Sequence, residues 1–153
     1  MIKKIINYIK RFLNIDKYDI YLAGSMSGMP NHNYPSFMHY AQKLRRAGYT
    51  VWNPAEHNNI GVPPCVCMRN DIDAIINKCN HIVILPGRKW KSSVGVSTEL
   101  CVAHVCGKRV FQIIENKKDY IYLKRIKTRD IRPYCQTKDK YRNDSIYSIF
   151  LNN

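Results

Sequence analysis

The chain of 153 residues lacks any apolar run close to the roughly eighteen residues of a membrane-spanning helix, so we expect no membrane span. Its first residues also lack the continuous apolar segment and cleavage site of a signal peptide, because basic residues interrupt the isoleucines of residues 1–15. We therefore expect a protein that is not secreted. Acidic residues are scarce, at 11 against 25 lysines and arginines, which leaves a formal charge of +14. At 45% hydrophobic residues the chain is too apolar to be disordered, and its length suits one domain.

Metal-ligand spacing is also missing, although the chain has six cysteines. Cys65 and Cys67 are separated by one residue rather than the usual two, and no second pair completes a tetrahedral set. In a chain without an export signal, cysteines are expected as reduced thiols. We therefore expect no disulfides, no metal and no cofactor. The sequence shows no internal repeat.

The positive charge is concentrated at the two ends of the chain. Residues 1–18 carry a net charge of +4 and residues 117–153 a net charge of +6, which leaves +4 for residues 19–116. Basic ends can bind nucleic acid or another anionic surface. They can also be solvated, partly disordered ends of a lysine-rich protein. We favour this second interpretation, because the aromatic and basic pattern of an RNA-binding module is absent.

Residues 1–18 predict a basic amphipathic helical extension, with isoleucines at helical spacing from Ile2 to Ile9. Such a helix packs on its own domain or on a partner subunit, and the alternative is a membrane surface. Residues 117–153 predict a basic, partly irregular extension. The weakly periodic stretch 120–126 within it has no assigned role.

Residues 19–116 predict strands that alternate with helices. The expected strands span residues 19–23, 49–52, 81–85 and 109–114, and the expected helices span residues 35–47, 66–78 and 96–106. This order indicates a small Rossmann-like, three-layer α/β domain, with helices flanking a parallel sheet of about four to five strands. Ligands of such sheets bind beyond the carboxyl ends of the strands. Three loops lie there, at residues 24–28, 53–57 and 86–95.

The first of these loops contains Gly24, Ser25, Ser27 and Gly28. Its backbone amides and two hydroxyls can cradle a phosphate or a sugar. A glycine loop of this kind can also be a simple turn. We therefore treat the loop as a candidate binding site.

The third loop places Ser93 and Gly95 just before Glu99, which we expect in the first turns of the next helix. The helix dipole there favours an ionised carboxylate. A charged glutamate beside a sugar can attack its anomeric carbon, as glycosidase nucleophiles do. The alternative is that Glu99 only complements the start of the helix.

A second carboxylate is needed to protonate the leaving group. Asp71 and Asp73 are the candidates, on the helix before the third strand. Two acids in different environments can divide the roles of nucleophile and acid. The alternative is that both are ordinary surface residues of a helix.

The segment 19–116 resembles a family of phage and bacterial proteins of uncharacterised function, related to nucleoside 2-deoxyribosyltransferases and deoxynucleoside-monophosphate N-glycosidases. The resemblance rests on several motifs in the same order, which lie at residues 21–28 (YLAGSMSG), 33–37 (NYPSF), 44–45, 48–49, 53–56 (NPAE), 85–87 (LPG) and 93–99. It implies that Glu99 attacks C1′ of the deoxyribose and that Asp71 assists departure of the base. It further implies that Tyr21 lies near the nucleophile and that Ser25 and Ser93 contact a 5′-phosphate.

The sequence departs from the pattern of those glycosidases at two places. Met26 and Ser27 stand where the first loop has an arginine, for which Arg88, Lys89 or Lys91 of the third loop can substitute. Asn80 stands where an acid often precedes the third strand.

Two more residues are candidates for substrate binding. Asn53 belongs to the resembling motif at residues 53–56. Trp90 can stack on a base, and the alternative is that it covers a hydrophobic edge.

Together these observations predict cleavage of the N-glycosidic bond of a nucleoside or its 5′-monophosphate, by hydrolysis or by base exchange. The alternative is a non-catalytic module of the same fold that binds, senses or sequesters a nucleotide. The resemblance also implies a homo-oligomer, in the cytoplasm of a bacterium or of a phage-infected cell.

Overall fold

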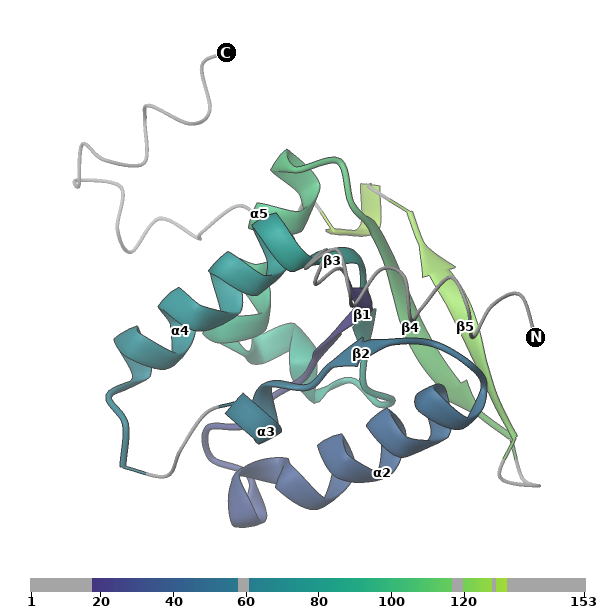
Figure 1. Ribbon diagram of the computed structural model, residues 1–153, viewed down its shortest axis with the longest axis horizontal. Helices are drawn as coiled ribbons and strands as arrows, with labels where there is room; N and C mark the ends of the chain where they lie inside the picture. Colours follow the sequence, from purple (N-terminus) through teal and green to yellow (C-terminus); the bar gives the residue numbers. More distant parts are fainter. Residues whose placement is uncertain (1–17, 58–60, 117–119, 128, 132–153) are drawn as a thin grey trace, which may run out of the picture.

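The computed structural model describes residues 18–57, 61–116, 120–127 and 129–131 (Figure 1). The helix predicted within residues 1–18 and most of the extension predicted at 117–153 lie outside these residues. The description below therefore concerns the central domain and the part of the chain that directly follows it.

Within the described residues a five-stranded sheet forms the centre of the domain. In the spatial order β2-β1-β3-β4-β5, the first four strands are parallel and β5 runs antiparallel to β4. The strands are β1 (Tyr18–Ala23), β2 (Val51–Trp52), β3 (Cys79–Ile84), β4 (Arg109–Glu115) and β5 (Ile121–Ile126). This arrangement confirms the predicted small Rossmann-like α/β domain.

Helices cover both faces of the sheet (Figure 1). They are α2 (Tyr34–Arg46), α3 (Pro54–His57), α4 (Pro64–Asp73) with its π-helical continuation η2 (Ala74–Lys78), α5 (Val94–Val105), and the short 3-10 turns η1 (Pro30–Asn33) and η3 (Lys89–Ser92). None of the described helices is both long and apolar enough to cross a membrane.

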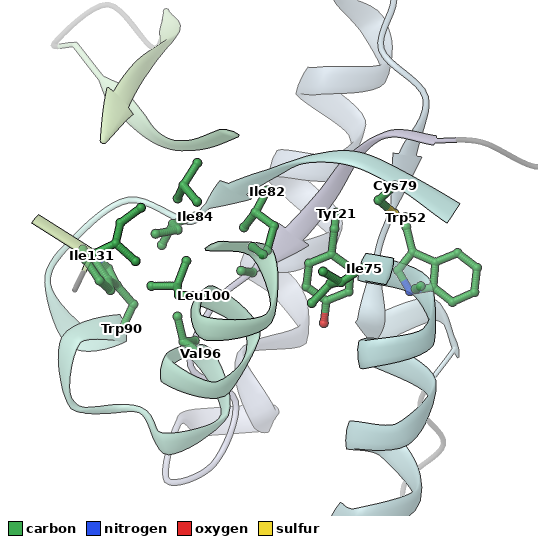
Figure 2. Close-up of a cluster of buried hydrophobic side chains, with 14 residues drawn as sticks. Tyr21, Trp52, Ile75, Cys79, Ile82, Ile84, Trp90, Val96, Leu100 and Ile131 are labelled. Carbon is green, nitrogen blue, oxygen red and sulfur yellow. The ribbon is translucent and has the colours of Figure 1, made fainter. Parts of the chain in front are cut away.

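Two hydrophobic clusters hold the layers together, one on each face of the sheet. In β1 the side chains alternate, so that Tyr21 and Ala23 enter one cluster while Ile20 and Leu22 enter the other. Residues of α4, η2 and α5 complete the first cluster (Figure 2), and residues of α2 complete the second. Because both faces of β1 are covered, its sequence is continuously apolar from Ile20 to Ala23.

The sheet continues past residue 116, because β5 pairs with β4 from Val110 opposite Ile126 to Glu115 opposite Ile121. Ile131, which follows β5, is 4% exposed and belongs to the cluster under α5. The periodicity of this segment is weak because β5 lies at the edge of the sheet, where much of its surface remains exposed.

The strand order switches direction between β1 and β3 at the carboxyl edge of the sheet. The chain leaves β1 to form β2 on one side and later returns to form β3 on the other side of β1. The loops that follow β1 and β3 therefore lie next to each other, which is the usual location of a ligand site in open α/β sheets.

Gly24 ends β1 at a point where no side chain fits. A Cβ atom there would lie 2.8 Å from Cδ1 of Leu85 and 3.1 Å from Cζ of Phe37, both of which are buried. We expect Gly24→Ala to lower the free energy of unfolding by about 1–3 kcal/mol, as overpacking of a core does. Gly95→Ala is the matched control, because its Cβ atom would lie 3.5 Å from Cε of Met68, an ordinary contact inside α5. Urea denaturation measures both, and equal midpoints would contradict this account.

Candidate active site

A tyrosine and two carboxylic acids meet beneath the carboxyl edge of the sheet. The hydroxyl of Tyr21 donates a hydrogen bond of 2.8 Å to Oε1 of Glu99. Tyr21 is fully buried, and Glu99 and Asp71 are each 6% exposed. Asp71 is close enough for its charge to raise the pKa of Glu99. The structure thus brings together the three residues predicted as catalytic.

Each of the three comes from a different element. Tyr21 lies on the β1 face that packs against the α4 and α5 layer, and Figure 2 shows its ring beside Ile75 with the hydroxyl at the end away from the strand. Asp71 is the eighth residue of α4. Glu99 is the sixth residue of α5, so it lies deeper in the helix than the first turn.

The pKa of Glu99 differs from the prediction of an ionised carboxylate. Burial raises the pKa of Glu99 to about 8, and the negative charge of Asp71 acts in the same direction, while the hydrogen bond from Tyr21 opposes them. The expectation that the helix start keeps Glu99 ionised is therefore wrong, because loss of hydration outweighs the dipole at this depth. Burial also raises the pKa of Tyr21 well above its ordinary value, so Tyr21 remains a hydrogen-bond donor at neutral pH.

The second acid is Asp71 rather than Asp73. Asp73 is exposed, where its carboxylate pairs with Nζ of Lys78 at 3.3 Å and accepts a hydrogen bond of 2.8 Å from Nδ2 of Asn77. Asp73 therefore does not reach the buried pair. The alternative that the two acids are surface residues applies to Asp73 alone.

Glu99 has one oxygen left for a ligand. Its Oε2 atom is buried and has no hydrogen-bond partner among the residues that the structure describes. An unsatisfied buried oxygen of this kind is unfavourable in an empty protein. A substrate that reaches it would relieve this penalty.

The first loop has a second buried polar atom without a partner. Oγ of Ser25 makes no hydrogen bond within the described part of the chain. Nδ2 of Asn33 donates to the carbonyl oxygen of Ser25 at 2.9 Å and so holds the loop. Gly28 adopts a φ of +73°, which favours glycine, and Ser27 is exposed. The loop is thus a fixed turn with one free hydroxyl.

The chain then makes a left-handed turn that the sequence analysis missed. Three consecutive residues, Asn31, His32 and Asn33, have φ values of +48°, +52° and +60°. Each such non-glycine residue costs on the order of 1 kcal/mol, and asparagine tolerates this conformation best. The Asn-His-Asn sequence was the available signal. The turn places Asn33 against the first loop.

Two of the predicted binding residues have structural roles. Oγ of Ser93 caps α5 by accepting a hydrogen bond from the backbone N–H of Val96 at 3.3 Å. Oδ1 of the fully buried Asn53 accepts from the N–H of Ala55 at 3.1 Å and thereby supports the start of α3.

Trp90 is buried, with 5% of its surface exposed, and packs in the cluster that contains Ile131 (Figure 2). It is therefore not available to stack on a base in this conformation. The alternative, in which the tryptophan covers a hydrophobic edge, is the correct one, because η3 turns its side chain inward.

The third loop is positively charged and lies against the first. Arg88, Lys89 and Lys91 are all exposed. Nζ of Lys89 lies 3.7 Å from Sδ of Met29, just beyond the first loop. Nε2 of Gln112 donates to the carbonyl oxygen of Gly87 at 2.7 Å and ties the third loop to β4. Positive charge therefore lies beside the first loop, at the carboxyl edge of the sheet.

A shallow, open hollow lies next to the left-handed turn. Its lining residues come from η1 and the first turns of α2, and they are Met29, Asn31, His32, Tyr34, Pro35 and Met38. Glu99 and Asp71 are not among them, so the hollow is not the place where these acids act. Among the described residues no group of His, Cys, Asp and Glu side chains is arranged to hold a metal ion.

Residues 18–112 match the family described as "Domain of unknown function (DUF4406)". Because this segment is more than half of the chain, the chain belongs to that family. No curated protein and no solved structure matches it. The matched segment includes Tyr21, Asp71 and Glu99, and it ends within β4, so β5 lies outside it.

The raised pKa of Glu99 predicts how stability depends on pH. Folded Glu99 keeps its proton up to a pKa of about 8, whereas the unfolded residue loses it near 4.5. The folded state therefore binds more protons across this range, and stability falls as the pH rises through it. We expect Glu99→Gln to become more stable relative to the wild type by about 3–4 kcal/mol between about pH 5 and pH 8.5.

Urea denaturation at both pH values measures this change. Glu56→Gln is the control, because Arg45 lowers the pKa of Glu56 and moves its titration below this range. The difference between Glu56→Gln and the wild type should therefore stay constant. A constant difference for Glu99→Gln as well would contradict the assigned pKa.

Proposed function

We propose that this chain cleaves the N-glycosidic bond of a nucleoside 5′-monophosphate or of the corresponding nucleoside, by hydrolysis or by base exchange. The observation that carries the proposal is the buried hydrogen bond between Tyr21 and Glu99 beside Asp71. Two buried acids whose charges interact are suited to a reaction that needs one carboxylate and one proton donor. The resemblance of residues 19–116 to nucleoside 2-deoxyribosyltransferases supports the same reaction.

In the proposed reaction the carboxylate of Glu99 attacks C1′ of the sugar. The bond between C1′ and the base nitrogen breaks, and a proton from Asp71 neutralises the departing base. Water, or the nitrogen of a second base, then attacks C1′, gives a proton to Asp71 and releases Glu99 as a carboxylate. Tyr21 would orient the attacking oxygen and stabilise its charge by its hydrogen bond.

The reaction depends on which of the two acids holds a proton. At neutral pH the raised pKa leaves a proton on Glu99 in the free protein. Attack by Glu99 requires this proton to move to Asp71, which then donates it to the departing base. The two acids interact, so they titrate as a pair, and the form that holds one proton is the active one. We therefore expect kcat/KM to fall as the pH rises above about 8.

A nucleotide sensor is the second candidate, and the same pKa favours it. A neutral, buried glutamic acid can donate a hydrogen bond to a sugar hydroxyl and accept one from another. Such a protein would release its nucleotide intact. The product of the reaction therefore distinguishes the two functions.

The proposal includes a homo-oligomer. It rests on the resemblance of residues 19–116 alone, because the exposed Val94 and Val105 lie at opposite ends of α5 and form no continuous apolar surface.

The decisive test is chromatographic detection of free base. Each nucleoside and nucleoside monophosphate, in deoxy and ribo forms, is incubated with the protein, with and without a second base. We expect Glu99→Gln to reduce release of base by at least about a thousandfold and Asp71→Asn by about a hundredfold or more, because each removes a group that acts in the transition state. Asp73→Asn is the matched control on the same helix and should retain wild-type activity.

Turnover that survives Glu99→Gln would refute the mechanism. A swapped base in the product would identify a transferase. If all substrates remain intact while a nucleotide binds the pure protein, the sensor takes the place of the enzyme.

The charge of the third loop predicts a preference for the monophosphate. Nζ of Lys89 lies beside Met29, directly after the first loop, and the hydroxyl of Ser25 in that loop makes no hydrogen bond to the described residues. We expect Lys89→Ala to raise KM for the monophosphate about tenfold, the effect of one charge-assisted hydrogen bond, with kcat and the KM of the nucleoside unchanged. Steady-state kinetics with both substrates measure this effect.

Arg46→Ala is the control, because it also removes one positive charge. Arg46 is exposed and is the last residue of α2, whereas the first loop precedes the start of that helix. An equal change in KM for both variants would indicate a general effect of net charge. An equal change for nucleoside and monophosphate would exclude phosphate recognition by Lys89.

A further inference from the structure

The edge strand β5 exposes two aromatic side chains. Tyr120, directly before the strand, is 70% exposed, and Tyr122 within it is 56% exposed. The backbone of Tyr120 is held by Asn116, whose Oδ1 accepts from the N–H of Tyr120 at 3.1 Å and whose own N–H donates to the carbonyl of Tyr120 at 3.0 Å. The first tyrosine therefore continues the hairpin of β4 and β5.

The two tyrosines share one face with a lysine. Tyr122 pairs with Ile114 and Lys124 with Gln112, while Leu123 points to the other face. Alternation along the strand places Tyr120 on the same side as Tyr122. We call Tyr120, Tyr122 and Lys124 the tyrosine strip.

The spacing of the tyrosine strip suits the stacking of bases. Residues two apart in a strand are separated by about 6.8 Å. Successive bases of an extended single strand can be held at a comparable distance when each stacks on an aromatic ring. Proteins that bind single strands without sequence preference combine such rings with positive charge.

The surroundings of the strip supply that charge. Lys124, Arg125, Lys127 and Arg129 are exposed and follow one another closely in the chain. The described acids nearby are engaged, since Asp130 pairs with Arg129 at 3.8 Å and Glu115 with Lys43 at 2.7 Å. Neither Lys124 nor Arg125 forms an ion pair with another described residue.

We propose that the tyrosine strip binds single-stranded nucleic acid, with bases stacked on Tyr120 and Tyr122 and a phosphate paired with Lys124. β5 lies outside residues 18–112, the segment that matches the family. Binding here does not depend on the chemistry at Glu99. The proposal departs from the preference stated from the sequence, because the tyrosines and the lysine share one face of a strand that the sequence analysis did not assign.

Binding is measured by the fluorescence anisotropy of a labelled oligothymidylate of about twelve nucleotides, titrated with the full chain. We expect the double variant Tyr120→Ala/Tyr122→Ala to weaken binding at least about tenfold, and the double variant with phenylalanine at both positions to bind like the wild type. Tyr49→Ala, at an exposed tyrosine that precedes β2, is the control and should have no effect. Higher salt should weaken binding of the wild type.

Binding that is equal in the alanine variant and the wild type would overturn the proposal, because the basic ends of the chain would then account for it. Loss in both the alanine and phenylalanine variants, or an equal loss in Tyr49→Ala, would also overturn it. If the alanine variant does not fold, photo-crosslinking of a 4-thiothymidine oligonucleotide to the wild type replaces it. A crosslink in the tryptic peptide 119–124 supports the proposal, and crosslinks confined to other peptides refute it.

Discussion

The site depends on the burial of one carboxylic acid. Glu99 lies in an apolar layer where it loses its hydration, and its compensation within the described residues is the hydrogen bond from Tyr21. Removal from water favours the neutral form of the acid, which raises its pKa. An acid that only complemented a helix start would be more stable at the surface. The structure therefore maintains an arrangement that opposes stability, which is typical of functional sites.

The rest of the carboxyl edge holds the loops in place around this acid. Gly24 permits close packing against Leu85, Asn33 fixes the first loop, and Gln112 fixes the third. Each of these contacts uses a polar or small residue to position backbone rather than to offer a reactive group. Oγ of Ser25 and Oε2 of Glu99 are buried and make no hydrogen bond to the described residues. Pre-organisation of this kind reduces the entropy that a substrate must lose on binding.

The positive charge of the chain divides into separate surfaces. The third loop brings lysine and arginine to the carboxyl edge of the sheet beside the first loop, where a phosphate group would lie in the proposed reaction. β5 places another group of basic residues beside two exposed tyrosines, beyond the segment that defines the family. A net charge alone does not distinguish these surfaces from a solvated face, because long-range attraction is unspecific. The two surfaces are distinguished by the residues that surround each group of charges.

The sequence by itself determined the alternation of strands and helices, because apolar runs, proline starts and glycine stops are local signals. It also predicted Tyr21, Asp71 and Glu99, through motifs whose order matches a known family. Only the tertiary structure decided that Glu99 is protonated at neutral pH, that Asp73 is excluded and that Trp90 is buried. These properties depend on which elements pack together, and so does the pairing of β5. The hydration, charge and exposure of a side chain depend on neighbours that are distant in the chain. Local sequence patterns therefore do not predict them.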